Sequence, residues 1–123
     1  MAAGSNVTIT SPMYGTTGHY PHNVDCRWGI VTSQARELNI STLSMALEHH
    51  QNCRYDYVDI YKRFRTNMTL IRNICKPLQK NILTNGSAFF HFHSDVGLND
   101  DGFQIQIRAA QGKTTCFNLN SDI

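Results

Sequence analysis

The chain has 123 residues, of which 41% are hydrophobic and 16% charged, and its formal net charge is +2 at pH 7. These values describe one globular domain with a modest core, and a charge this small does not by itself indicate a nucleic-acid partner. No apolar run approaches the ~18–20 residues that a membrane span requires, and the first residues lack the apolar core of a signal peptide. We therefore expect no membrane span in this chain and no nucleic acid among its partners.

Alternation of apolar and polar residues recurs along the chain and predicts short strands. The pattern occurs in six segments: 6–10, 26–31, 37–47, 55–61, 87–93 and 102–109. Helical periodicity is weak, and one patch, 43–48, is ambiguous. Turn-forming residues separate the segments: Ser11-Pro12, Tyr20-Pro21, Asn85-Gly86 and the NDDG run at 99–102. Short strands at roughly ten-residue spacing favour an all-β antiparallel sandwich.

The strand pattern continues to about residue 110 without an internal repeat or a linker. We expect 1–5 to be an N-terminal tail of the kind that cloning adds, and 6–110 to be the domain. The remaining residues, 111–123, are expected to be a C-terminal tail or the start of a following segment.

Cysteines and glycosylation sequons indicate the compartment. The four cysteines, Cys26, Cys53, Cys75 and Cys116, allow two disulfides in three pairings. No C-x-x-C motif occurs, so a zinc ribbon or a thioredoxin-type site is not expected. The four N-x-S/T sequons are predicted glycosylation sites: Asn6, Asn39, Asn67 and Asn85. Together these features favour a protein that is secreted or that forms the extracellular part of a membrane protein.

A series of motifs follows along the chain in this order: SPMY (11–14), YPHNVDCRWGI (20–30), LEHHQNCRYDYVDI (47–60), Cys75, FHSD (92–95) and GF (102–103). In kind and order they resemble the CUB domain family. The resemblance runs from about residue 7 to residue 109. It implies a jelly-roll-like β-sandwich of about ten strands, extracellular, that binds rather than catalyses and forms one domain of a larger protein.

The resemblance also implies a disulfide between Cys53 and Cys75. The family's usual N-terminal cysteine, which would bridge to Cys26, is missing upstream. Cys26 then pairs with Cys116 or has no partner in this chain, and pairing is favoured because an exposed thiol is a liability in an oxidising compartment. The family's Cys-Gly is Cys75-Lys76 here, and KRFRT replaces its usual Asp-Gly turn.

Many members of the family bind calcium, and the resemblance assigns the acidic ligands to Glu48, Asp56 and Asp95. Ca²⁺ takes six to eight oxygen ligands, and carboxylates gathered in one place repel each other unless a cation or protons intervene. A backbone carbonyl near Val96 or Gly97, the Asn99 side chain and waters could complete the shell. The alternative is that all three acids are solvated loop charges.

The predicted function is therefore non-enzymatic recognition of a protein partner, with calcium as the cofactor. Carboxylates ordered by the ion would bind a Lys or Arg of that partner, as the resemblance implies. Tyr14 matches a family tyrosine beside this site, where it could support an acid or touch the ligand; the alternative is a half-buried packing tyrosine.

Histidines offer a metal-enzyme alternative. His91 and His93 would lie on one face of a strand at a spacing that zinc can use, and His49 or His50 could supply a third ligand. Nothing in the sequence shows that these side chains converge, so exposed strand histidines are the favoured interpretation, and no zinc hydrolase is predicted.

The basic run at 61–66, with Lys62, Arg63 and Arg65 around Phe64, is similar to contact patches for sulfated glycans. Further cations follow at Arg72, Lys76 and Lys80. On a strand, successive side chains point to opposite faces, so the run need not form one surface. A sulfated-glycan or adhesion module is the second candidate function, and an accessory substrate-binding domain of an extracellular protease is the third.

Overall fold

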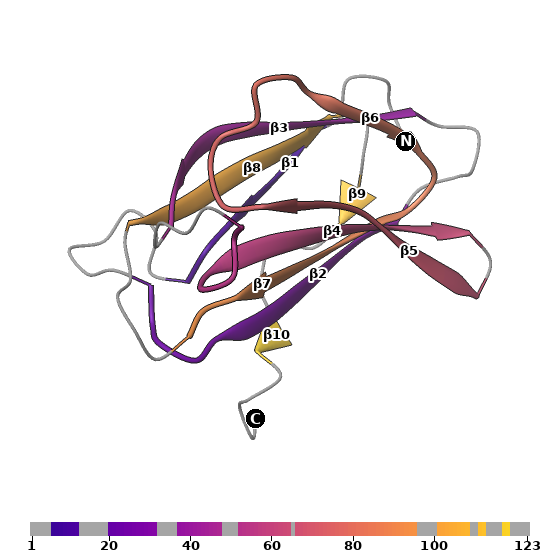
Figure 1. The fold of residues 1–123 in the computed structure, drawn as a ribbon. Helices are drawn as coiled ribbons and strands as arrows, with labels where there is room; N and C mark the ends of the chain where they lie inside the picture. Colours follow the sequence, from indigo (N-terminus) through magenta and orange to yellow (C-terminus); the bar gives the residue numbers. More distant parts are fainter. Residues whose placement is uncertain are drawn as a thin grey trace.

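Two antiparallel sheets face each other (Figure 1), and their buried apolar side chains form the core. The computed structural model describes residues 6–12, 20–31, 37–47, 52–64, 66–95, 101–108, 111–112 and 117–118. Within these residues all regular structure is strand, and no helix is long and apolar enough to cross a membrane.

The first sheet has the strand order β1-β8-β3-β6. These strands are β1 (Asn6–Thr10), β8 (Gly102–Arg108), β3 (Glu37–Ala46) and β6 (Ile82–Asn85). The second sheet has the order β10-β2-β7-β4-β5, with β9 also paired to β2. Its strands are β10 (Phe117–Asn118), β2 (Asp25–Val31), β7 (Ala88–His93), β4 (Tyr57–Phe64), β5 (Asn67–Ile74) and β9 (Gln111–Gly112). The predicted all-β antiparallel sandwich is confirmed.

The alternating segments fold as their periodicity predicts. In β7, Ala88, Phe90 and Phe92 are buried, while the residues between them are half-buried on the outer face. The same pattern buries one face of β2 and β4 in this sheet and of β1, β3 and β8 in the other: Val7, Ile9, Cys26, Trp28, Ile30, Leu38, Ile40, Val58, Ile60, Phe103, Ile105 and Ile107. Because side chains alternate along a strand, one apolar face per sheet is enough to build this core.

A β-bulge in β3 explains the one ambiguous patch. The register with β8 shifts between Thr42 and Ser44, so the alternation changes phase there. Leu43 is consequently 52% exposed, while Met45 and Leu47 return to the core. A bulged strand places apolar residues at spacings that resemble helical periodicity, which is why the sequence left this patch open.

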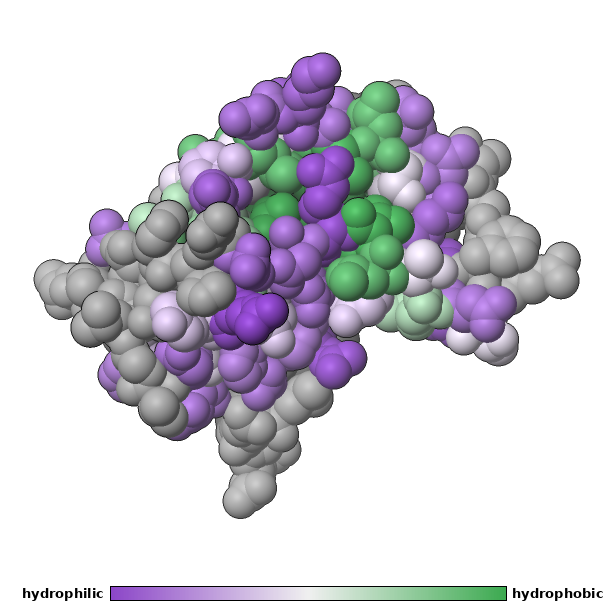
Figure 2. All heavy atoms as spheres, in the orientation of Figure 1, coloured by the Kyte–Doolittle hydropathy of each residue, from purple (hydrophilic) through white to green (hydrophobic). Residues whose placement is uncertain are grey.

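Two strands, β5 and β6, lie outside the predicted segments. β5 pairs along β4 at the edge of the second sheet and buries only Ile74, so it shows no alternation. β6 is only four residues long, at the edge of the first sheet. Figure 2 shows apolar surface between these two strands, and exposed apolar side chains occur on both: Met68, Leu70 and Leu83. The side of the sandwich that carries β5 and β6 therefore presents apolar surface.

Disulfides brace the fold at two points. The predicted Cys53–Cys75 bridge is confirmed and spans a sequence separation of 22. Cys26 is also disulfide-bonded, and Cys116, the fourth cysteine, lies outside the described residues. In the segment expected to be a tail, β10 pairs with β2 next to Cys26, and β9 pairs with β2 farther along.

Candidate functional site

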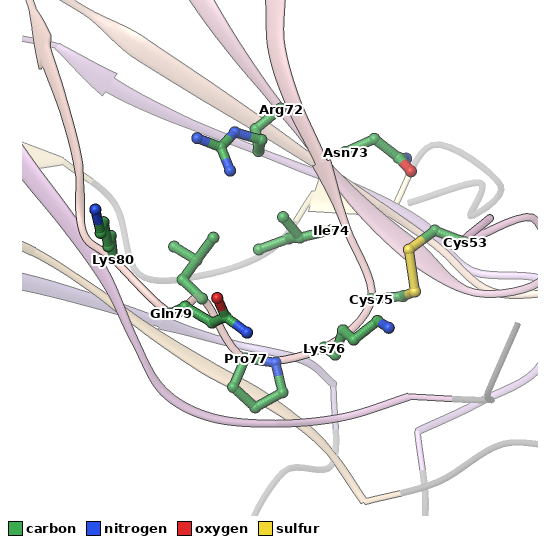
Figure 3. A pocket seen from close by; sticks show the side chains of 10 residues that line it. Cys53, Arg72, Asn73, Ile74, Cys75, Lys76, Pro77, Gln79 and Lys80 are labelled. Atoms are coloured by element: carbon green, nitrogen blue, oxygen red, sulfur yellow. A yellow bond between two sulfur atoms is a disulfide. The ribbon is translucent and has the colours of Figure 1, made fainter. Parts of the chain in front are cut away.

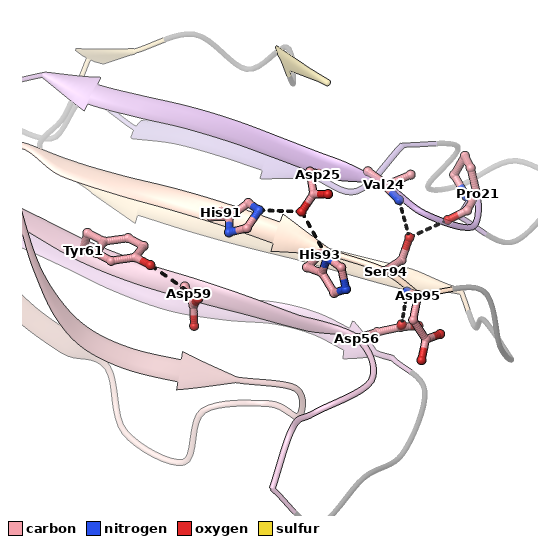
Figure 4. A network of polar contacts seen from close by, with 10 residues as sticks. All are labelled: Pro21, Val24, Asp25, Asp56, Asp59, Tyr61, His91, His93, Ser94 and Asp95. Atoms are coloured by element: carbon pink, nitrogen blue, oxygen red, sulfur yellow. Dashed lines mark hydrogen bonds and ion pairs between the residues drawn. The ribbon is translucent and has the colours of Figure 1, made fainter. Parts of the chain in front are cut away.

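Asp56 is a fully buried carboxylate at one end of the sandwich, directly before β4. Its Oδ2 accepts a hydrogen bond from the Tyr20 hydroxyl. Its Oδ1 accepts one of 2.9 Å from the Asp95 backbone N–H, which Figure 4 shows. Tyr20 is itself fully buried, with its ring edge-on to Phe92 at 5.3 Å between centroids. We call Tyr20, Asp56 and Asp95 the acidic corner.

Hydrogen bonds of Ser94 connect the chain segments that carry the acidic corner. Its hydroxyl donates to the Pro21 carbonyl at 2.7 Å and accepts from the Val24 N–H at 2.9 Å. Its backbone N–H donates to the Val24 carbonyl at 2.9 Å, and the Asn23 N–H donates to the Asp95 carbonyl at 3.1 Å. The end of β7 is thus tied to the segment before β2, which fixes where Asp95 lies.

Burial and a neighbouring charge shift the pKa of the Asp56 carboxyl in the acidic corner. Burial raises the pKa of the Asp56 carboxyl above its ordinary value of 3.8, and the negative charge of Asp95 raises it further. The hydrogen bonds from Tyr20 and from the Asp95 backbone act in the opposite direction, because they favour the ionised form. A nearby cation would favour the ionised form as well, so these two acids suit a cation site.

The structure brings together two of the five residues assigned to calcium, Asp56 and Asp95. The other three, Glu48, Val96 and Asn99, lie outside the described residues, as does Tyr14. Among the residues that are described, no group of three or more His, Cys, Asp or Glu side chains could hold a metal ion.

Tyr20 and Ser94 are contributors that the sequence did not single out. Tyr20 entered as part of a Tyr-Pro turn and of the motif at 20–30, without a role of its own, and its bond to Asp56 spans 36 residues. A partial signal was present, because a tyrosine in the segment that leads into an apolar strand has an apolar ring to bury and a hydroxyl that then needs a partner.

His91 and His93 lie on the outer face of the second sheet. His91 Nε2 and His93 Nδ1 lie 2.8 Å and 3.0 Å from the same Oδ1 of Asp25 (Figure 4). The Tyr57 ring stacks on His93 at 5.1 Å between centroids. The strand therefore places both imidazoles on one face as predicted, where they contact a carboxylate. His49 and His50 lie outside the described residues.

Lys62 and Arg63, the described cations of the basic run at 61–66, lie on opposite faces of β4. Lys62 follows Ile60 on the inward side of β4, whereas Arg63 follows Tyr61 on the outward side. The Arg63 guanidinium lies 5.9 Å from the centre of the Phe89 ring. Arg65 lies outside the described residues, and so does the side chain of Phe64.

The glycosylation sequons stay predictions, and the structure gives their positions. Asn6, Asn67 and Asn85 are exposed at strand ends. Asn39 is half-buried in β3, and its Oδ1 is buried without a hydrogen-bond partner among the described residues.

Comparison with known proteins gives one family. The sequence profile of the family described as CUB domain matches residues 2–107. The cubilin homolog of Drosophila melanogaster is 34% identical over 113 residues, which is 89% of this chain and 3% of that protein. Human Tolloid-like protein 1 is 28% identical over 93 residues, which is 74% of this chain and 9% of that protein. The chain thus spans a small fraction of the relatives that it matches.

Solved structures give the same fold. The second CUB domain of MASP-1, in a crystal structure described as bound to Ca²⁺, matches with a TM-score of 0.70 and 23% identity. That match covers 87% of this chain and 95% of the other. The full extracellular region of zebrafish Gpr126/Adgrg6 matches with a TM-score of 0.65 and 25% identity, over 89% of this chain and 14% of that region.

Proposed function

This chain belongs to the CUB domain family, and on that premise we propose that it recognises a protein partner in a calcium-dependent manner. CUB domains are extracellular modules for protein interaction, and this one belongs to a secreted protein or to the extracellular part of a membrane protein. The partner would present a Lys or Arg to carboxylates that the ion orders. No catalytic role is assigned to the domain.

The observation that carries the proposal is the fully buried Asp56 carboxylate beside Asp95. A buried carboxylate is costly unless it is hydrogen-bonded and balanced by a cation or a proton. Calcium would supply that balance, with Glu48, Asp56 and Asp95 as acidic ligands and Val96 and Asn99 completing the shell. The related MASP-1 domain described as bound to Ca²⁺ supports the choice of ion.

The ion would act in two ways. With a dissociation constant on the order of 10⁻⁴ M and millimolar calcium, as is typical of extracellular modules, it would add about 1–1.5 kcal/mol to the free energy of unfolding. It would also hold carboxylate oxygens in place for an incoming ammonium or guanidinium group, which strengthens a charge-assisted hydrogen bond.

Calorimetric titration of the metal-stripped chain with calcium tests the site. We expect one ion to bind the parent and the Asp56→Asn variant to lose at least about tenfold in affinity, because the side-chain shape is kept and the charge removed. Asp59→Asn is the matched control, since Asp59 lies three residues away and hydrogen-bonds Asn73 on the outer face. Equal calcium affinity in the parent and in Asp56→Asn would contradict the site.

A second measurement tests whether the calcium-loaded chain binds a lysine side chain. A surface coated with a lysine-bearing peptide should retain the calcium-loaded chain and release it on chelation. The same peptide with acetylated lysines should not retain it, because acetylation removes the charge. Calcium binding without this retention would leave a structural ion and remove the recognition role.

A further inference from the structure

Cations are concentrated in one continuous part of this chain. Between Asp59 and Asp95 the sequence contains no Asp or Glu, although the chain has nine acidic residues in all. The same stretch contains six of the eleven Lys and Arg residues: Lys62, Arg63, Arg65, Arg72, Lys76 and Lys80. The small net charge of the whole chain, +2, therefore conceals a strongly basic segment that runs from β4 through β5 to the connection before β6.

The last three of these cations surround a hollow beside β5. It measures about 450 Å³ and lies between β5 and the connection that leads to β6 (Figure 3). Buried Ile74 and half-buried Leu78 line it with apolar surface. We call this site, with Arg72, Lys76 and Lys80 around it, the basic hollow.

The three cations are exposed and unbalanced. Arg72 and Lys80 lie toward one end of the hollow, and Lys76 lies toward the disulfide at the other (Figure 3). Among the described residues, no Asp or Glu lines the hollow, and none forms an ion pair with any of the three cations. Like charges gathered without a counter-charge create a positive potential that attracts polyanions.

Covalent and hydrogen-bonded contacts hold the backbone of the basic hollow. The Cys53–Cys75 disulfide closes one end. Farther along the connection, the Leu78 N–H donates to the Thr42 hydroxyl at 3.0 Å, which ties the loop to β3 in the opposite sheet. Pro77 between them restricts the backbone further. The cations therefore project from a fixed frame, which reduces the ordering cost of binding.

We propose that the basic hollow is a binding site for sulfated polysaccharide. Sulfate groups stay ionised at any physiological pH, and an Arg guanidinium can bind an anionic oxygen group through two hydrogen bonds. The apolar floor offers a surface for the apolar face of a sugar ring, and the exposed Gln79 amide can hydrogen-bond its hydroxyls. An extracellular domain meets sulfated polysaccharides, whereas it seldom meets nucleic acid.

The test is anisotropy titration of a labelled heparin oligosaccharide in chelator at several salt concentrations. Arg72→Gln/Lys80→Gln removes two cations from the basic hollow. Arg27→Gln/Arg108→Gln removes the same charge from exposed residues that do not line it. Thermal melting of each variant confirms that it is folded.

We expect the Arg72/Lys80 variant to bind on the order of tenfold more weakly at 0.15 M salt, and the slope of log affinity against log salt to fall by about two. The Arg27/Arg108 variant should change by less than about threefold. The desulfated oligosaccharide should bind neither variant nor parent.

Four results would overturn the proposal. The parent could fail to bind heparin, or the two double variants could lose affinity equally, which would indicate a general field and no site. The desulfated sugar could bind as well as the sulfated one. Vesicles of phosphatidylserine could bind through Arg72 and Lys80 where heparin does not, which would assign the basic hollow to lipid headgroups. Since chelator is present throughout, these results are independent of the calcium site.

Discussion

The acidic corner and the basic hollow are built in opposite ways. The acidic corner joins Tyr20, Asp56 and Asp95 from three separate parts of the chain, and buries one carboxylate completely. The basic hollow takes its cations from one short stretch, Arg72 to Lys80, and leaves all three exposed. Folding is needed to create the first arrangement, whereas the second keeps most of its charge density in the unfolded chain.

This difference determines what each region can bind and how. Fixed carboxylates within a hydrogen-bonded frame suit a small ion with defined ligand distances, and such a site is coupled to stability. Exposed cations on β5 and on the connection after it suit an extended polyanion, and salt screens their attraction. The first interaction should therefore respond to chelators, and the second to ionic strength.

The largest expected effect separates the two regions by stability. Asp56→Ala removes the acceptor for two hydrogen bonds, from the Tyr20 hydroxyl and from the Asp95 N–H. A buried donor left without an acceptor costs about 1–3 kcal/mol, so we expect a loss of about 2–6 kcal/mol in the free energy of unfolding. Lys80→Ala, on an exposed side chain, should change it by less than about 0.5 kcal/mol. Urea unfolding in chelator measures both.

A second prediction concerns the Cys53–Cys75 disulfide, which connects the acidic corner with the basic hollow. Cys53 lies three residues before Asp56, and its disulfide partner Cys75 lines the basic hollow. Replacing both cysteines by alanine should lower the free energy of unfolding by about 3 kcal/mol, from the loop that the bridge closes. Urea unfolding measures the loss. A value below about 1 kcal/mol would show that contacts such as Leu78 to Thr42 hold the loop without the bridge.

The sequence predicted the fold where one face of a strand is buried. In β7, strict alternation of Phe90 and Phe92 with His91 and His93 gave both the strand and its inward face. The sequence did not predict β5, because seven of its eight residues are exposed or half-buried. Nothing in such a pattern distinguishes an edge strand from a loop. The bulge at Thr42 was not predicted either, because it depends on the register with β8, which the sequence pattern of β3 alone does not contain.

The candidate site was predictable only in part. Asp56 and Asp95 were assigned from the motifs around them, and the structure places them in contact. Alternation along the strand separates the buried Asp56 from the partly exposed Asp59, which faces outward, but it does not show that Asp56 contacts Asp95. The role of Tyr20 required the tertiary fold, because its ring packs on Phe92 while its hydroxyl reaches Asp56.

The third prediction uses pH to examine the acidic corner. The pKa of Asp56 is raised by burial above 3.8, so the folded protein binds this proton more tightly than the unfolded chain does. The contribution of this carboxyl to stability is therefore favourable at low pH and is lost as the pH rises from 3.8 through the raised folded pKa. Most acids in ion pairs show the opposite trend.

Unfolding of the parent and Asp56→Asn, compared in chelator across this pH range, isolates the effect because the other titrating groups are common to both. Relative to Asp56→Asn, the parent should lose stability as the pH rises. Calcium should reverse the trend in the parent, because it binds the ionised carboxylate. A parent that gains stability relative to the variant in chelator would place the folded pKa below the unfolded one.

The smallest expected effect is the interaction between the two regions. Their described hydrogen bonds share no partner, since Asp56 bonds Tyr20 and Asp95 while the loop of the basic hollow bonds Thr42. Changes at sites without shared partners add to within about 0.3–0.5 kcal/mol. Asp56→Asn and Lys80→Gln should therefore be additive in a double-mutant cycle of unfolding. A coupling above about 1 kcal/mol would show that the strand and disulfide between the regions transmit changes from one to the other, and calcium would then be expected to alter polyanion affinity by the matching factor.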